Sequence, residues 1–167
     1  SDPAMRSERL VYRALDEAQA DSLAERDRAA RRDLMSLREV LASRLVHSVY
    51  QPVVDISLTK VLGWEALSRP VGGQFESIEH LFKAAYEAQS VWSLERICRE
   101  RAMEGLPVMK DKALLFLNVE PDSIYDPQFR SDETIEMLER ASLTPDRVVL
   151  EMTEHSAIRD FIAFRQT

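Results

Sequence analysis

The stretch VYQPVVDISLTKVLGWEALSR, residues 49–69, holds two apolar runs separated by a short polar connection. Each run has the length and the β-branched content typical of a strand, and two such runs joined by a short link predict a β-hairpin. The second run carries a glutamate, Glu65, among residues that otherwise belong to a buried strand. Because a buried carboxylate without a partner is costly, Glu65 needs a cation or hydrogen-bond donors.

Downstream of the hairpin, strand-like and helix-like segments alternate with short links. Near-continuous apolar runs at 112–120 and 147–154 predict strands that are buried on both faces. Helical periodicity predicts helices over the segments 77–89, 91–106, 131–143 and 158–167, with Ser77 and Ser131 as N-caps and Gly105 as a stop. This order predicts an α/β fold with a parallel sheet and right-handed crossovers.

The first 47 residues differ in texture from the rest of the chain. No Gly or Pro lies between Pro3 and Pro52, which predicts a long helix from about residue 7 to residue 48. We interpret 1–5 as a tag remnant, 6–47 as this helix and 48–167 as the folded domain. An apolar stripe predicts that the C-terminal half of the helix packs on its own domain or on a second copy, while a signalling coiled coil, a linker and a simple cap all remain open; the stripe comprises Leu34, Leu37, Leu41 and Leu45.

Composition excludes several classes of function. The chain has 167 residues and a net charge of −7, all of it contributed by residues 51–167, which argues against a nucleic-acid partner. No apolar run reaches the length of a membrane span or of a signal peptide, so no membrane insertion is expected. Cys98 is the one cysteine, and we interpret it as a small apolar helix residue in a protein of a reducing, cytoplasmic compartment.

Oxygen-bearing side chains lie near the ends of three successive predicted strands: Glu65, Asn118 and Glu151. The carboxyl ends of parallel barrel strands meet at one mouth, and two carboxylates with an amide are the oxygen ligands typical of Mg²⁺ or Mn²⁺. Arg69 follows Glu65 by four residues and could bind a phosphate. The alternative is structural: Glu65 pairs with Arg69, and the other two side chains satisfy turn backbone.

Three motifs in this order resemble the EAL domain family of bacterial cyclic di-GMP phosphodiesterases. They are YQPVVDISLTKVLGWEALSR, FLNVEP and LEMTE, within residues 49–167. The resemblance implies that Glu65 is catalytic and binds metal with Asn118 and Glu151, and that Arg69 and Gln51 contact the substrate. Glu154 matches the second acid of the family's Glu-x-Thr-Glu motif, and we interpret it as a structural residue that makes a hydrogen bond or supports the metal ligands.

The same resemblance implies a (β/α)₈ barrel of TIM type with an antiparallel first strand, of which this chain supplies about four strands. It implies a two-metal site, with Mg²⁺ or Mn²⁺, that hydrolyses cyclic di-GMP to linear pGpG. The sequence departs from the family at Glu120, where a small polar residue is usual, and further family ligands would lie beyond Thr167.

From these departures we expect this chain to be inactive, and to form a homo-oligomer or swapped dimer that covers its exposed sheet. We expect the parent protein to be an active phosphodiesterase controlled by an upstream sensor domain. Two alternatives remain: a non-catalytic cyclic di-GMP receptor, and a module in which the N-terminal helix dimerises and relays a signal.

Overall fold

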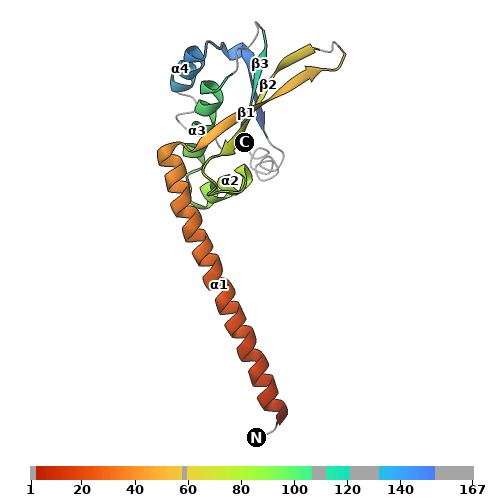
Figure 1. Cartoon of the computed structure of the whole chain (residues 1–167), viewed down its shortest axis with the longest axis vertical. Helices are drawn as coiled ribbons and strands as arrows, with labels where there is room; N and C mark the ends of the chain where they lie inside the picture. The colour runs from red at the N-terminus through yellow and green to blue at the C-terminus, as the bar shows by residue number, and fades with distance from the viewer. Residues whose placement is uncertain (1–2, 58–59, 107–111, 121–131, 153–167) are drawn as a thin grey trace, which may run out of the picture.

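The computed structural model describes residues 3–57, 60–106, 112–120 and 132–152 (Figure 1). α1 projects as a long rod from a body in which the strands lie together and the other helices lie alongside them. No described helix combines the length and the apolar character needed to cross a bilayer. In chain order the elements are α1 (Pro3–Ser43), β1 (Val46–Asp55), β2 (Lys60–Pro70), α2 (Ile78–Glu87), α3 (Val91–Glu104), β3 (Leu114–Val119), α4 (Asp132–Arg140), the 3₁₀ helix η2 (Pro145–Arg147) and β4 (Val148–Met152).

The strands form one four-stranded sheet in the order β1-β2-β3-β4. β1 and β2 are antiparallel, as the predicted hairpin requires, whereas β2, β3 and β4 are parallel to one another. β2 and β3 approach closely at Gly63, where an added Cβ would lie 2.1 Å from the carbonyl oxygen of Leu114. The predicted α/β fold with an antiparallel first strand is confirmed.

One face of the sheet packs against α3 and α4 and forms part of the core. The buried residues of this cluster are Ala66, Ala102, Met103, Leu115, Leu117, Leu138 and Leu143. The prediction that the strands are buried on both faces is wrong. β3 alternates between buried and more accessible residues, and β4 exposes Leu150 by 48% and Met152 by 60%. For β3 the reason is that the helices of this cluster cover a single face. Leu150 and Met152 lie on that same face, in register with Leu117 and Val119, and they are exposed because β4 is the outer strand of the described sheet.

The last turns of α1 pack into a second core cluster, as the apolar stripe predicts. Leu37 and Val40 are 1% and 0% exposed and contact a cluster that includes Phe75, Leu81 and Leu94. The helix ends at Ser43, five residues earlier than predicted, because Arg44 adopts a left-handed backbone with φ of 53°. α1 is thus fixed to the body at one end only.

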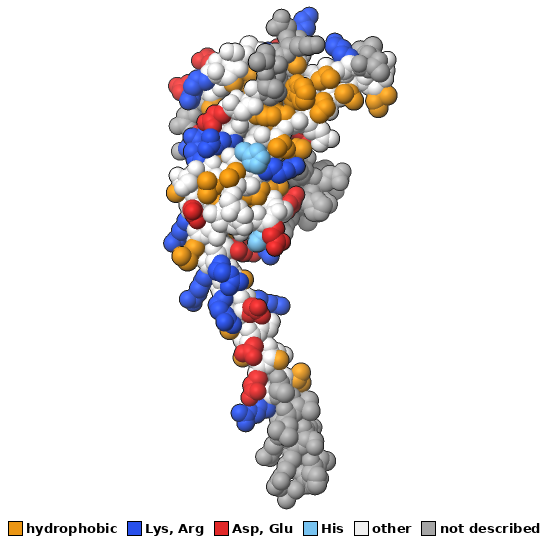
Figure 2. Space-filling model, in the orientation of Figure 1, with side chains coloured by type: hydrophobic (Ala, Val, Ile, Leu, Met, Phe, Trp, Pro, Cys, Tyr) orange, Lys and Arg blue, Asp and Glu red, His pale blue; other side chains and the backbone are white. Residues whose placement is uncertain are grey.

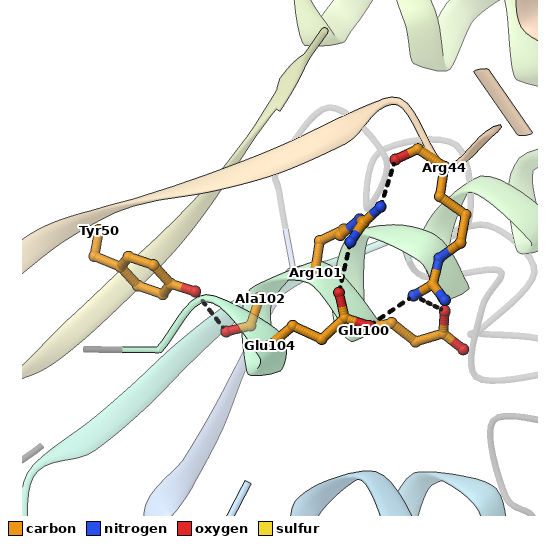
Figure 3. Close-up of polar contacts among 6 residues, drawn as sticks. All are labelled: Arg44, Tyr50, Glu100, Arg101, Ala102 and Glu104. Atoms are coloured by element: carbon orange, nitrogen blue, oxygen red, sulfur yellow. Dashed lines mark hydrogen bonds and ion pairs between the residues drawn. The ribbon is translucent and has the colours of Figure 1, made fainter. Parts of the chain in front are cut away.

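Arg44 also anchors the α1–β1 joint to α3 (Figure 3). Its guanidinium contacts Glu100 at 2.6 Å and Glu104 at 3.0 Å, while Arg101 pairs with Glu104 at 2.7 Å and donates to the carbonyl oxygen of Arg44 at 3.1 Å. Farther along β1, Tyr50 donates from its hydroxyl to the carbonyl oxygen of Ala102 at 2.7 Å. These contacts fix β1 against the helical layer and leave the other face of the hairpin accessible.

Candidate functional site

The strand register places the predicted ligand residues on one face of the sheet. Gln51 pairs with Glu65, Glu65 pairs with Phe116, and Asn118 pairs with Glu151. Asn118 follows Phe116 by two residues, and residues two apart in a strand point to the same side. All four polar side chains therefore project from the face opposite the α3 and α4 cluster.

Two of these side chains are in direct contact. The Asn118 amide donates from Nδ2 to Oε1 of Glu65 at 2.9 Å. Glu151 is near enough for an electrostatic effect: burial raises the pKa of its carboxyl group, and the charge of Glu65 raises it further. The structure thus brings Glu65, Asn118 and Glu151 together, with two carboxylates that repel each other.

The structural alternative predicts an ion pair between Glu65 and Arg69. The two side chains, both within the described part of β2, do not form that pair. Arg69 is exposed, and its Nη1 donates to the carbonyl oxygen of Ser68 at 2.8 Å. Its charge also helps to lower the pKa of Glu79, after the larger effects of hydrogen bonds from the Ser77 side chain and the Glu79 backbone. Arg69 and Gln51 are both accessible, as a substrate contact requires. Their contacts with a substrate stay a prediction.

The side chains at this site determine which kind of metal ion it suits. In the described ranges, no three His, Cys, Asp or Glu side chains gather into a group that could hold a metal ion. Glu65, Asn118 and Glu151 are two carboxylates and an amide, which is a hard oxygen set suited to Mg²⁺, Mn²⁺ or Ca²⁺ rather than to zinc. Glu154 lies outside the described residues, so its predicted hydrogen bond stays a prediction.

The unusual residue at position 120 points away from this face. Oε2 of Glu120 accepts a hydrogen bond from the Tyr86 hydroxyl at 2.6 Å, and the Glu120 backbone N–H donates to Oε1 of Glu95 at 2.8 Å. Both partners belong to helices, α2 and α3. The structure therefore places this extra carboxylate against the helical layer.

Sequence analysis missed the buried pair of Glu95 and Arg99 on α3, which are 3% and 4% exposed. Arg99 donates from Nη1 to Oε2 of Glu95 at 2.9 Å. Opposite charges four residues apart fall among the apolar positions Leu94, Ile97 and Cys98, but this spacing is also common on exposed helix surfaces. Cys98 is the small packing residue we expected: it packs against the core cluster, and burial raises its pKa to about 12.

Comparison with known families decides the identity of this arrangement. The sequence profile of the EAL domain matches residues 34–167, which is most of the chain. The chain belongs to the EAL domain family. Residues 3–33 of α1 precede the match, so the EAL domain begins within the helix, close to the turns that pack on the body.

Solved and curated relatives agree with this assignment. The EAL domain of Xanthomonas citri FimX, in complex with cyclic di-GMP, is 25% identical with a TM-score of 0.65, over 85% of this chain and 55% of that one. Klebsiella pneumoniae BlrP1, in complex with manganese and cyclic di-GMP, is 28% identical with a TM-score of 0.58, over 73% of this chain and 30% of that one. BlrP1 structures also hold cyclic di-GMP with calcium or without metal ions.

A curated relative from Caulobacter vibrioides, an uncharacterized signaling protein, is 28% identical over 165 residues. The match covers 95% of this chain and 19% of that protein. This chain therefore spans a small part of the curated relative and about half or less of the two solved EAL proteins.

Proposed function

We propose that this EAL domain binds cyclic di-GMP next to divalent cations held by Glu65, Asn118 and Glu151, in a bacterial signalling protein that hydrolyses the dinucleotide to linear pGpG. The observation that supports this most is the convergence of the three side chains on one sheet face, with Glu65 and Asn118 2.9 Å apart. The two solved relatives support the ligand, because both hold cyclic di-GMP.

The electrostatics of the site fit a cation. Glu65 and Glu151 repel each other, which contributes to the raised pKa of Glu151. A divalent cation such as Mg²⁺ or Mn²⁺ would relieve that repulsion and would add a partner for Glu65 beyond the Asn118 amide. When bound, such ions supply an activated water and stabilise charge at phosphorus.

The remaining site residues bind and orient the substrate. Arg69 is exposed on the same face of β2 as Glu65, four residues on, where its guanidinium can pair with a phosphate. Gln51 lies on the neighbouring strand, directly opposite Glu65, where its amide can contact a nucleotide. The chain's own contribution is thus to place two carboxylates, one amide and one guanidinium along a single face.

Metal binding and nucleotide binding need separate tests, because BlrP1 holds cyclic di-GMP even without metal ions. We expect the wild-type chain to bind Mn²⁺ in calorimetry, Glu65→Gln to lose that binding, and Glu39→Gln on exposed α1 to retain it. Cyclic di-GMP is then titrated with Mn²⁺ and with EDTA, with GMP as the negative control. Binding of cyclic di-GMP that is unaffected by Mn²⁺, EDTA and Glu65→Gln would instead support the receptor function.

Hydrolysis is tested on the full-length parent protein, by chromatography of the products. We expect linear pGpG to form with Mg²⁺ or Mn²⁺ and to be absent from the Glu65→Gln parent. A parent that binds cyclic di-GMP and leaves it intact with either metal would contradict the phosphodiesterase proposal.

We also propose that α1 joins two copies of the chain. Its described residues from 15 to 28 are exposed, and charged side chains of both signs lie along it (Figure 2). In a parallel pair with Leu15, Ser22 and Ala29 at position a, position d holds Ala18, Glu25 and Arg32, and Asp21 falls opposite Arg26 of the second copy. The same register places Arg28 opposite Asp33, whose Oδ2 also lies 3.2 Å from Nε2 of His80 in its own copy.

Light scattering after size exclusion tests this pairing. We expect a dimer for the wild type, a monomer for Asp21→Arg, and a restored dimer for the charge-swapped Asp21→Arg/Arg26→Asp. Asp27→Arg is the matched control, because residue 27 lies on the outer side of the same pair. A monomeric wild type at concentrations of about 100 μM would exclude the proposal, because a pair with a dissociation constant of about 1 μM would be largely dimeric there.

A further inference from the structure

The end of β3 that carries Asn118 is held differently from the rest of the strand. The ladder between β2 and β3 pairs Gly63–Ala66 with Leu114–Leu117, and Asn118 lies one residue past its last pair. On its other side Asn118 still pairs with Glu151 of β4. On the β2 side, the Asn118 side-chain amide donates a hydrogen bond to Glu65.

Side chains from the helical layer hold the backbone just beyond this point. The Glu120 N–H donates to Oε1 of Glu95 at 2.8 Å, and the Glu120 carboxylate accepts from the Tyr86 hydroxyl at 2.6 Å. Glu95 is in turn fixed by Arg99, whose Nη1 donates to its other oxygen at 2.9 Å. One residue, two positions after Asn118, is therefore bonded to both α2 and α3.

We infer that Glu95 is a positioning residue for the candidate site: by holding the backbone at Glu120, its carboxylate fixes the Asn118 amide against Glu65. Glu95 lies on the helical side of the sheet and does not touch the face that carries the ligands. It acts through the backbone between residues 118 and 120. Its effect on metal binding rests on the proposed function, whereas its effect on the direction of Asn118 does not.

The buried pair suits this task because it is rigid. Glu95 and Arg99 are almost fully shielded from water, so neither side chain can exchange its partner for solvent at low cost. Burial raises the pKa of Glu95 to about 7, but either protonation state keeps an oxygen that can accept the Glu120 N–H. The anchor of β3 is therefore retained whether or not this carboxyl group is charged.

The sequence offers a direct way to observe the consequence. Asn118 is the sole asparagine among the 167 residues, so labelling with ¹⁵N-asparagine gives one pair of side-chain amide signals. Those signals report the hydrogen bond to Glu65 without any metal. Glu65→Gln defines the signal of the altered partner, and Asn118→Asp confirms the assignment by removing the pair.

Three variants separate positioning from stability. Glu95→Met/Arg99→Met removes both charges and the acceptor while keeping apolar bulk, and such replacements of a buried pair are often tolerated. We expect its Asn118 signals to move toward those of free asparagine. Glu95→Gln keeps the acceptor and should keep the wild-type signals. Glu100→Gln, on the same helix but paired with Arg44, is the control and should not move them.

A second pair of variants tests the same bond from its other end. Glu120→Pro removes the N–H that Glu95 accepts and leaves Glu95 and Arg99 unchanged, while Glu120→Ala keeps the N–H. We expect the Asn118 signals to move in Glu120→Pro and to stay in Glu120→Ala. These two variants decide the question even if the double methionine variant fails to fold.

Addition of Mn²⁺ then links the anchor to the site. Half-broadening of the Asn118 signals should need about tenfold more Mn²⁺ in the displaced variants, a loss typical of residues that orient metal ligands. Unmoved Asn118 signals in folded Glu95→Met/Arg99→Met, or in Glu120→Pro, would overturn the inference and leave Glu95 as a core residue. If wild-type signals ignore Mn²⁺ but still depend on Glu95, metal binding fails while the positioning role stands.

Discussion

Glu65 and Glu95 are glutamates on opposite sides of the same sheet, and their surroundings differ completely. Glu65 lies on the accessible face, where it accepts a hydrogen bond from the Asn118 amide, and a second carboxylate, Glu151, lies close by. Glu95 lies on the buried side of α3 and is 3% exposed, with a guanidinium on one oxygen and a backbone N–H on the other. Among the described residues, Glu95 has an ion-pair partner and Glu65 has none.

This difference separates architecture from function. A buried charge that receives a counter-charge and a hydrogen bond on each oxygen holds elements together and needs no ligand. Two carboxylates that share a face, with no counter-charge paired to them among the described residues, cost free energy, and such a cost is typical of a cation-binding site. The contrast makes the Glu65 face, and not the Glu95 pair, the place to look for chemistry.

Leucine at position 95 should give the largest effect on folding. Glu95→Leu leaves the Arg99 guanidinium and the Glu120 N–H buried without their acceptor, and breaking a buried pair in this way costs about 3–5 kcal/mol. We expect the free energy of unfolding in urea to fall by that amount. Glu65→Leu, on the accessible face, should cost less than about 1 kcal/mol. Equal losses for the two variants would erase the contrast between the two carboxylates.

The second-largest expected effect is the contribution of Glu95 to the pH dependence of the free energy of unfolding. Burial raises its pKa from 4.5 to about 7 in the folded chain, so between these values the folded state holds a proton that the unfolded state has released. The stabilising contribution is complete below about pH 4.5 and is lost as the pH rises through about 7. A shift of this size corresponds to roughly 3 kcal/mol.

Glu95→Gln isolates this contribution, since glutamine keeps the acceptor and does not titrate. Urea unfolding of both proteins from pH 4.5 to pH 8 should show the wild type losing stability relative to the variant as the pH rises. A difference that is constant across this range, or that grows in the opposite direction, would mean that Arg99 keeps Glu95 ionised throughout.

The sequence predicted the accessible face better than the helical side. Glu65 stands out because a carboxylate interrupts an apolar strand, and the EAL motifs extend the same logic to Asn118 and Glu151. Glu95 and Arg99 are also charges in an apolar pattern, but a helix tolerates such pairs on its surface, so their spacing alone does not reveal burial. Only the packing of α3 against the end of β3 shows which side of the helix is covered.

The predicted burial of the strands failed for a related reason. An apolar run such as residues 114–117 predicts that the segment is a strand of a sheet. It does not predict how much of the strand's second face is covered by other elements. The end of α1 was also not predictable from the sequence. Arg44 ends the helix in a left-handed conformation, which is usually recognised in a sequence by Gly or Asn. Motifs and periodicity predicted the helices and strands. The burial of each strand face and the end of α1 depended on tertiary contacts.

On the accessible face, Glu65→Gln should weaken the binding of Mn²⁺ by about 100-fold or more. Residues that only orient a ligand cost about 10–100-fold, and a ligand itself should cost at least as much as the upper end of that range. The measurement is a Mn²⁺ titration followed by electron paramagnetic resonance. Glu136→Gln, exposed on α4, is the control and should bind as the wild type does. An unchanged affinity in Glu65→Gln would remove the reason to treat this face as a metal site.

The smallest expected effect concerns Tyr86, which links α2 to the residue that Glu95 also holds. Tyr86→Phe removes the hydroxyl that donates to Glu120 at 2.6 Å and leaves the ring in place. Because Tyr86 is 38% exposed, water can replace the lost donor, and the free energy of unfolding should fall by only about 0.5–1.5 kcal/mol. The Asn118 signals should stay near their wild-type positions, since the backbone bond from Glu120 to Glu95 remains. A displacement as large as that expected for Glu120→Pro would mean that α2, and not the buried pair of α3, sets the direction of Asn118.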